Sequence, residues 1–332
     1  MKQLVMGLVG GGRIGKMHAL NLINSVPEAR VKTIADPSLE EVWLKDLEHV
    51  GLVRESQLVF DDPEIEAVLI AAPTTTHVDL IKDAAKAGKH IFCEKPIDTN
   101  PARIQEAIDA ADSADVQLFV GFNRRFDANF MKIKRHVDEG DIGQIQIVKI
   151  TNRDPRLPPA RFLGRSGGIF MDFTVHDFDM ARFITGSEGV EVSVMGAAFH
   201  SEIEEAGDLD TAIVNLKMAN GALVSIDNSR QALYGYDQRL EVFGSKGSVS
   251  AENETPTRVV LSTRDAIHSD KPYFSFIERY HETYITEIKE FIRYILEKKD
   301  ARPSGQEALQ AVRLAIAAKQ SLEEKRTIIL DP

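Results

Sequence analysis

The chain has 332 residues, of which 43% are hydrophobic and 27% are charged, and its formal net charge is −11. This is an ordinary globular composition with enough apolar material for two domains, and the acidic balance argues against nucleic acid or an anionic membrane as a partner. The one cysteine, Cys93, excludes an intramolecular disulfide, and without a leader pattern or a bilayer-length apolar run the protein is expected in the cytoplasm.

Short apolar runs alternate with helical patterns over residues 1–122. Buried strands are predicted at Leu4–Val9, Val31–Ala35, Ala67–Ala72, His90–Cys93 and Leu118–Gly121. Helices are predicted between them, at Arg13–Asn24, Ser38–His49, Val78–Ala87 and Pro101–Asp112. Strands that are apolar on both faces and separated by helices form a parallel sheet covered on both sides. We therefore expect an α/β Rossmann domain with a doubly wound parallel sheet.

The pattern changes in residues 123–332. Helices are predicted at Asn129–Glu139, Asp172–Thr185, Phe276–Lys298 and Gln306–Glu323. Strands are predicted at Ile145–Thr151, Ala212–Met218, Ala222–Asn228, Arg239–Phe243 and Ser248–Ala251, and the last four form two hairpins. We expect an α+β C-terminal domain with a large open, mostly antiparallel sheet, which would bind substrate and form an oligomer face. The final helix is expected to pack back on the first domain.

The segment Gly10-Gly11-Gly12-Arg13-Ile14-Gly15 has the G-x-G-x-x-G spacing of a dinucleotide-binding turn, and it lies between a predicted strand and a predicted helix. Gly10 would make the tight turn, Gly12 would let the backbone approach a pyrophosphate, and Gly15 would let the helix pack on the strand. The first helical turn, with Arg13 and Ile14, would present free N–H groups to the phosphates. The alternative is a glycine-rich turn in an unrelated α/β protein.

Asp36 ends the second predicted strand, about 20 residues after the last glycine of the turn. A carboxylate at this place accepts hydrogen bonds from the adenosine ribose hydroxyls and repels a 2′-phosphate. Pro37 and Ser38 follow it, so no arginine stands there to hold such a phosphate. The pattern favours NAD over NADP.

Glu94-Lys95-Pro96 directly follows the predicted strand His90–Cys93. Ligands of an open parallel sheet lie beyond the carboxyl ends of its strands, so Lys95 is expected to point into the crevice where a nicotinamide would lie. Pro96 restricts Lys95 to an extended backbone, which fixes its direction. Taken alone, a lysine at the end of a strand is more often a solvated surface charge.

Asp172, His176 and Asp179 have the spacing i, i+4, i+7, which would place them on one face of a helix. A carboxylate one turn before an imidazole can orient the ring and raise its basicity. The alternative is a capping Asp172 and a structural His176. The nine histidines are dispersed, so no metal site is expected.

These segments together resemble the glucose–fructose oxidoreductase/inositol dehydrogenase family. The resemblance rests on the glycine turn, Asp36, Pro73-Thr74-Thr75-Thr76-His77 and Glu94-Lys95-Pro96, and it continues to Phe243-Gly244-Ser245-Lys246-Gly247. It implies that Lys95 is catalytic. It also implies a cofactor site to which Pro73, Thr74, Thr75, His77 and Glu94 contribute.

The family's D-x-x-x-H motif is matched by Asp172 and His176, with Thr174 in place of the usual glycine. The resemblance implies that His176 is the general acid/base and that Asp172 contacts this histidine or the substrate. It also implies a substrate pocket, for which the candidates are Arg125, Asn152 or Arg153, and Tyr234 or Tyr236. Each has a structural alternative, because tyrosines in strands commonly pack and arginines often form surface pairs.

The likeness is greatest to the inositol dehydrogenase branch of the family. It implies NAD-dependent oxidation of one ring hydroxyl of an inositol, myo or scyllo, to the inosose. In the expected mechanism His176 takes the hydroxyl proton, Lys95 donates to the substrate oxygen, and the nicotinamide accepts the hydride. An aldose or other sugar is the second substrate class, and a non-catalytic NAD-binding sensor is the third function considered. A homo-oligomer is implied, with a tetramer favoured.

Overall fold

A computed structural model describes residues 3–38, 47, 49–159 and 167–331, and the chain divides into two compact units. Unit 1 comprises Met1–Asn123 and Glu282–Val312, and unit 2 comprises Arg124–His281 and Arg313–Pro332. The expected division into residues 1–122 and 123–332 let only the final helix pack back on the first domain, whereas unit 1 includes the whole segment Glu282–Val312. This segment brings Phe291 against Phe92 and Phe119 of the first sheet, with ring centroids 5.8 and 5.6 Å apart.

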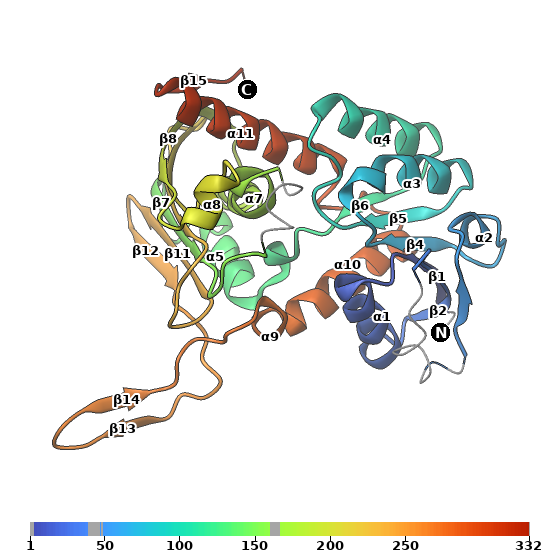
Figure 1. The fold of residues 1–332 in the computed structure, drawn as a ribbon, viewed down its shortest axis with the longest axis horizontal. Helices are drawn as coiled ribbons and strands as arrows, with labels where there is room; N and C mark the ends of the chain where they lie inside the picture. The colour runs from blue at the N-terminus through green and yellow to red at the C-terminus, as the bar shows by residue number, and fades with distance from the viewer. Residues whose placement is uncertain (1–2, 39–46, 48, 160–166, 332) are drawn as a thin grey trace. The chain divides into compact units, whose positions relative to one another are not determined.

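The sheet of unit 1 has six strands in the order β3-β2-β1-β4-β5-β6, and every pair is parallel (Figure 1). Their bounds are β1 Leu4–Val9, β2 Ala29–Ala35, β3 Gly51–Val53, β4 Ala67–Ile70, β5 His90–Cys93 and β6 Leu118–Val120. This is the strand order of a doubly wound dinucleotide-binding sheet, whose direction of winding changes between β1 and β4. The predicted Rossmann domain is confirmed.

Helices lie on both faces of this sheet (Figure 1). Those of unit 1 are α1 Arg13–Ser25, α2 Gln57–Phe60, α3 Thr74–Lys86, α4 Pro101–Ser113 and α10 His281–Glu297, which begins one residue before the unit boundary. Helices α3 and α4 lie together on one face, and α1 and α10 lie on the other. The predicted helix Ser38–His49 falls largely outside the described residues.

The sheet of unit 2 has seven strands in the order β12-β11-β7-β10-β9-β8-β15. Their bounds are β7 Ile145–Arg153, β8 Gly189–Ala197, β9 Thr211–Met218, β10 Leu223–Ser229, β11 Asp237–Gly244, β12 Gly247–Ala251 and β15 Ile328–Ile329. All neighbouring pairs are antiparallel except β7 with β10. The predicted open, mostly antiparallel sheet is confirmed.

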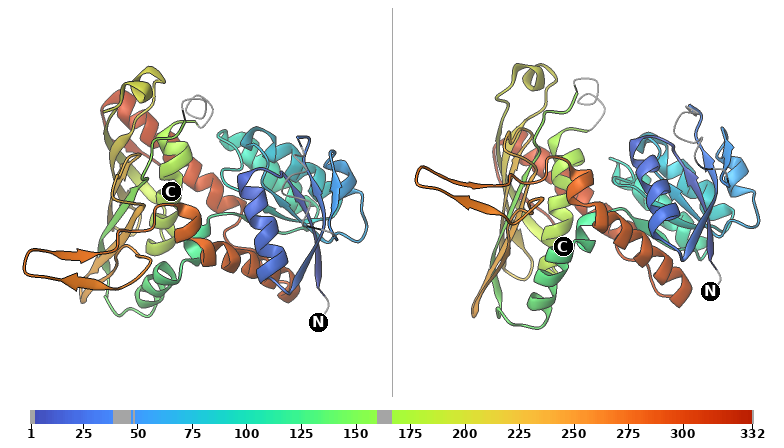
Figure 2. Two further views of the ribbon diagram at one scale, coloured as in Figure 1. Left: turned by 60° about the horizontal axis from the view of Figure 1, so that its bottom comes forward. Right: turned by 90° about the horizontal axis from the view of Figure 1, so that it is seen from below.

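One face of this sheet is covered by helices of the same unit, including α5 Ala128–Asp138 and α7 Val175–Thr185 (Figure 2). Val148, Ile150 and Ile226 point to this face and are buried, whereas Ile147 and Leu223 point the other way and are exposed. This alternation is what a sheet with one covered face requires.

The rest of unit 2 consists of short elements and the end of the chain. They are α8 Ser201–Glu205, α9 Phe276–Arg279, the hairpin β13 Val260–Ser262 with β14 Ile267–Ser269, and α11 Gly305–Glu324, which begins in unit 1. The hairpin extends away from the sheet of unit 2 in every view (Figures 1 and 2).

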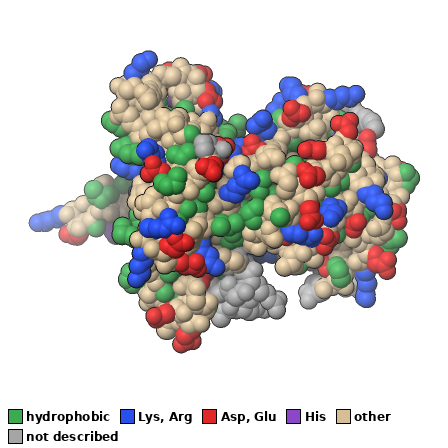
Figure 3. Space-filling model, turned by 90° about the horizontal axis from the view of Figure 1, so that it is seen from above, with side chains coloured by type: hydrophobic (Ala, Val, Ile, Leu, Met, Phe, Trp, Pro, Cys, Tyr) green, Lys and Arg blue, Asp and Glu red, His purple; other side chains and the backbone are tan. Residues whose placement is uncertain are grey.

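The surface carries charges of both signs. Lys and Arg side chains alternate with Asp and Glu side chains over the face drawn in Figure 3, without a large area of one sign. Within the described residues, no helix combines the length and the apolarity that crossing a bilayer would take.

Candidate functional site

The glycine turn of unit 1 has the shape that a phosphate-binding loop requires. Gly10 has a φ of +103°, and a Cβ there would lie 2.5 Å from the carbonyl oxygen of Ala71, so only glycine fits. Gly12 precedes the first residue of α1, and a Cβ there would meet nothing within 4 Å. Backbone N–H groups at the start of α1, where Arg13 and Ile14 lie, are thus approachable by an anion.

Asp36 lies directly beside this turn, at the end of β2. Its Oδ2 accepts a hydrogen bond from the Gly11 N–H at 2.5 Å, and its Oδ1 accepts one from the Ser38 N–H at 2.7 Å. Two backbone donors therefore hold the carboxylate next to the turn. This is the place from which an acidic residue reads the hydroxyls of an adenosine ribose.

Replacing Asp36 with alanine is expected to weaken NAD binding by about 10- to 100-fold, because hydrogen bonds to a charged carboxylate are lost. Binding of NADP should weaken less, since the repulsion of its 2′-phosphate disappears. The dissociation constants of both cofactors, measured by calorimetry, check this, with Asp79→Ala on an exposed face of α3 as the control. An unchanged ratio of the two constants would mean that another group reads the ribose.

The predicted cofactor loop Pro73–His77 forms the start of α3, with Pro73 just before the helix. Thr74 and Thr75 are accessible there. His77, in contrast, is 1% exposed, and its two ring nitrogens lie 2.9 and 2.7 Å from the carbonyl oxygens of Pro96 and Ala72. This placement favours a structural role for His77, in which its ring connects two loops by hydrogen bonds, over the predicted contact with the cofactor.

The Glu94-Lys95-Pro96 segment continues β5 at the carboxyl edge of the sheet. The Glu94 N–H still bonds the carbonyl oxygen of Ile70 at 2.9 Å. The Glu94 carboxylate turns inward to His18, and the Pro96 carbonyl is held by His77. Lys95, half-buried between these two anchors, therefore has a fixed backbone. Such an amine can donate to an oxygen that gains negative charge.

In unit 2, Asp172 does not lie on the regular α-helix that the spacing predicted. Phe170–Thr174 forms one turn of π-helix before α7 begins at Val175. Single π-helical turns inside helices are frequent at functional sites. Asp172 Oδ2 lies 3.3 Å from Nη1 of Arg230, whose side chain is 1% exposed. Sequence reasoning missed Arg230, because nothing in the sequence around it indicates a buried cation.

His176 is half-buried in the first turn of α7, and the next residue, Asp177, is completely buried. Asp177 accepts hydrogen bonds from Arg124 at 2.7 Å, Asn152 at 2.7 Å and Asn228 at 2.9 Å. Burial raises the pKa of the Asp177 carboxyl, and these three donors act in the opposite direction. The network fixes α7 against the sheet and so fixes the position of His176.

Two predicted substrate residues belong to this buried network. Asn152 is 0% exposed and also accepts a hydrogen bond from Gln238 at 2.5 Å. Tyr236 is 5% exposed with its hydroxyl 3.4 Å from Arg124, and burial raises the pKa of this hydroxyl well above its usual value. Both placements favour a structural role over contact with a substrate.

Arg153 and Tyr234 lie on the other side of the sheet from α7. Arg153 follows the inward-pointing Asn152, and successive side chains of a strand point to opposite faces. Arg153 donates to Asp227 at 3.0 Å and to the Tyr234 hydroxyl at 3.1 Å, and its pKa is raised mainly by the bond to Asp227. This placement argues against Arg153 and Tyr234 lining the same substrate pocket as His176 within one chain.

Arg125, the remaining substrate candidate, forms a bidentate pair with Asp179. Its Nε and Nη2 lie 2.8 and 2.6 Å from the two carboxylate oxygens, and its side chain is 10% exposed. Its guanidinium also lies over the ring of Phe183. Asp179, expected on one face with Asp172 and His176, is thus used to hold Arg125.

Comparison with known proteins agrees with these features. Residues 4–122 match the family model described as oxidoreductase family, NAD-binding Rossmann fold, and residues 130–250 match that of the GFO/IDH/MocA C-terminal domain. The chain is 47% identical over 324 residues to an uncharacterized oxidoreductase, YrbE, of Bacillus subtilis, covering 97% of this chain and 95% of the relative. It is 44% identical to the myo-inositol 2-dehydrogenase of Thermotoga maritima, covering 98% of each.

Solved structures show the same fold. A probable dehydrogenase from Thermotoga maritima has a TM-score of 0.96 at 44% identity, covering 98% of each chain. A scyllo-inositol dehydrogenase from Lactobacillus casei, solved with NAD(H) and scyllo-inositol bound, has a TM-score of 0.91 at 27% identity, covering 99% of each chain. The chain therefore belongs to the GFO/IDH/MocA family of NAD-binding oxidoreductases.

Proposed function

We propose that the protein is an inositol 2-dehydrogenase, which oxidises one ring hydroxyl of myo- or scyllo-inositol to the inosose and reduces NAD. The observation that carries the proposal is the 44% identity over nearly the whole length of the Thermotoga maritima myo-inositol 2-dehydrogenase. The chain's own residues support it, because Asp36 beside the glycine turn suits NAD and Lys95, Asp172 and His176 match the family's catalytic motifs.

In the proposed mechanism His176 accepts the hydroxyl proton, since an imidazole can act as a base near neutral pH. Lys95 donates to the same oxygen and stabilises the alkoxide character that develops as the hydride leaves. Bound NAD supplies the hydride acceptor. Asp172 acts on His176 or on a neighbouring substrate hydroxyl, and Arg230 holds its carboxylate.

The test is NADH formation with a panel of inositol stereoisomers, aldoses and deoxy sugars. We expect turnover on myo- or scyllo-inositol at least tenfold faster than on any sugar, because a site that hydrogen-bonds several hydroxyls rejects analogues that present them differently. Faster turnover of an aldose would assign the enzyme to the sugar dehydrogenases of the family. Binding of NAD without turnover of any polyol would favour the sensor.

We further propose that the enzyme is a cytoplasmic homo-oligomer, with four chains favoured. Ile147 on β7 pairs with Leu223 on β10 and with Phe243 on β11, and the three side chains are 38%, 53% and 43% exposed on the uncovered face of the sheet. An apolar row of this kind on an open sheet is typical of an interface. A single buried cysteine suits a reducing compartment.

Replacing Leu223 with glutamate is expected to lower the sedimentation coefficient, because a charge on the apolar row opposes association. Analytical ultracentrifugation at micromolar concentration checks this, with Lys82→Glu, on the exposed surface of α3 in unit 1, as the control. A variant that sediments like the parent chain would place the interface elsewhere.

A further inference from the structure

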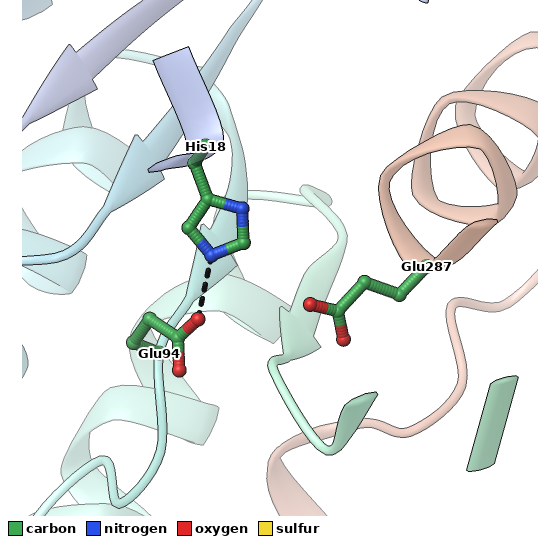
Figure 4. Close-up of side chains that lie close together, drawn as sticks. All are labelled: His18, Glu94 and Glu287. Carbon is green, nitrogen blue, oxygen red and sulfur yellow. Dashed lines mark hydrogen bonds and ion pairs between the residues drawn. The ribbon is translucent and has the colours of Figure 1, made fainter. Parts of the chain in front are cut away.

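Three ionisable side chains that are far apart in the chain meet inside unit 1. His18 comes from α1, Glu94 follows β5, and Glu287 comes from α10 (Figure 4). One nitrogen or oxygen atom of each lies within 4.8 Å of the others. His18 and Glu287 are both 0% exposed. The cluster joins the first helix, the end of β5 that leads to Lys95, and the returning segment of the chain.

The first contact of the cluster is a short hydrogen bond between His18 and Glu94. His18 Nε2 lies 2.6 Å from Glu94 Oε1, a distance typical of a bond to a charged carboxylate. His18 Nδ1 has no partner among the described residues. A second N–H would be buried without an acceptor, so we assign the ring proton to Nε2, which donates it to Glu94.

Glu287 completes the cluster without forming a bond of its own. Its carboxyl group points toward His18 and Glu94 in Figure 4. Neither of its oxygens has a hydrogen-bond partner in the described part of the chain. A buried carboxyl group in this situation takes up a proton rather than remain charged. In agreement, burial and the neighbouring Glu94 carboxylate raise the pKa of Glu287 well above its usual value.

A bound metal ion is the competing interpretation of a histidine and two glutamates. Two ligand atoms at 2.0–2.2 Å from one tetrahedral ion lie about 3.3–3.6 Å from each other. The 2.6 Å separation of His18 and Glu94 is shorter than this and fits a shared proton. The geometry therefore favours a proton-bearing cluster.

Glu94, the central member of the cluster, directly precedes Lys95 in the chain. Phe92 and Glu94 lie on the same face of extended chain, and the Phe92 ring contacts both His18 and Phe291. Lys95 therefore leaves the strand toward the opposite face. A Cβ at Gly121 would lie 3.1 Å from the Glu94 carboxylate, so this group rests closely against the backbone that follows β6.

We propose that His18 is a positioning residue that holds Glu94 on the α1 side of the sheet, beside Glu287 as an uncharged carboxylic acid, and thereby aims Lys95 toward the other side. The proposal rests on the proposed role of Lys95 in the reaction. It assigns no contact with substrate to either residue.

The charge of Glu287 is tested by infrared spectroscopy of the full-length protein. We expect a carbonyl band of a protonated carboxylic acid at neutral pH that disappears in Glu287→Gln. The matched control is Glu106→Gln on the surface of α4, which should leave the band in place. The assignment of Glu287 as an uncharged acid would be overturned by absence of the band. It would also be overturned by one equivalent of a transition metal in elemental analysis of the purified protein.

The positioning role of His18 and the uncharged state of Glu287 are tested by three variants. Glu287→Gln keeps the shape of an uncharged acid, so its kcat should stay within about twofold of the parent. His18→Gln keeps a donor near Glu94, whereas His18→Leu removes it and should lower kcat about tenfold or more with a smaller change in KM. Crystal structures should show the Glu94 carboxylate in place in His18→Gln and displaced in His18→Leu. If His18→Leu does not fold, His18→Asn replaces it, because the shorter asparagine side chain cannot bring its donor to Glu94.

Two outcomes overturn the proposal. One is an unmoved Glu94 in the variant that lacks the donor, and the other is a kcat of Glu287→Gln that falls more than tenfold. These results are distinguishable from a failure of the proposed function. If the parent protein oxidises no inositol, the infrared band and the position of Glu94 still decide this proposal.

Discussion

Lys95→Ala is expected to lower kcat for polyol oxidation by about 10²–10³-fold, the usual effect of removing one donor to a developing oxyanion. The loss should be confined to turnover, because Lys95 is proposed to stabilise charge that is largest in the transition state. Dissociation constants for NAD should change little. Steady-state kinetics with the best inositol, together with calorimetric titration of NAD, measure both quantities.

The control for this variant is Lys82→Ala, which removes a lysine from the exposed surface of α3, also in unit 1. Its kcat and NAD affinity should match the parent. Undiminished turnover of Lys95→Ala would remove this residue from the mechanism. Loss of NAD binding in proportion to kcat would assign it to cofactor binding alone.

Asp177→Ala is expected to reduce the free energy of unfolding by about 3–5 kcal/mol, because it leaves the Arg124 guanidinium buried without its counter-charge. The Arg124 side chain is 5% exposed, so water cannot replace the lost carboxylate. Asn152 and Asn228 lose an acceptor in the same change. Denaturant unfolding followed by circular dichroism gives this free energy.

The matched control is Lys149→Ala, which breaks the exposed pair with Glu241 on the opposite face of the same sheet. Exposed pairs add little to stability, so its unfolding curve should lie close to that of the parent. If Asp177→Ala has the same free energy of unfolding as the control, the buried network is dispensable for stability. Retained stability with lost turnover would point to a direct effect on His176.

Most of unit 1 could be predicted from sequence because its signals are local. Runs such as Leu4–Val9 and His90–Cys93 are apolar on both faces, and each predicted bound agrees with the observed strand. The position of Lys95 then follows from one rule, that ligands lie beyond the carboxyl ends of parallel strands. The bounds of strand β8 do not follow from such local signals, and its position between β9 and the two-residue edge strand β15 depends on pairing with other parts of the chain.

The residues of the site were harder to predict where the end of a strand decides which face a side chain points to. The predicted strand stopped at Thr151, whereas β7 continues to Arg153. Once Asn152 and Arg153 lie in one strand they must point to opposite faces, so they cannot both line one pocket. The choice between Tyr234 and Tyr236 was likewise open, because burial is a property of the folded chain.

Contacts between distant parts of the chain gave no sequence signal at all. His18 and Glu287 are separated by most of the chain, and neither stands in a recognised motif. The pairing of Asp172 with Arg230 joins a π-helical turn to the residue that follows β10. Only the fold brings such residues together, so periodicity and spacing could not have found them.

The interrupted course of unit 1 also has a consequence for biosynthesis. A ribosome releases residues 1–123 first, but Phe291 and the rest of Glu282–Val312 emerge only after all of residues 124–281 have been made. Until then the rings of Phe92 and Phe119 lack a partner that covers them in the finished protein. The nascent nucleotide-binding half should therefore mature late, and a fragment cut at residue 123 should be prone to aggregate.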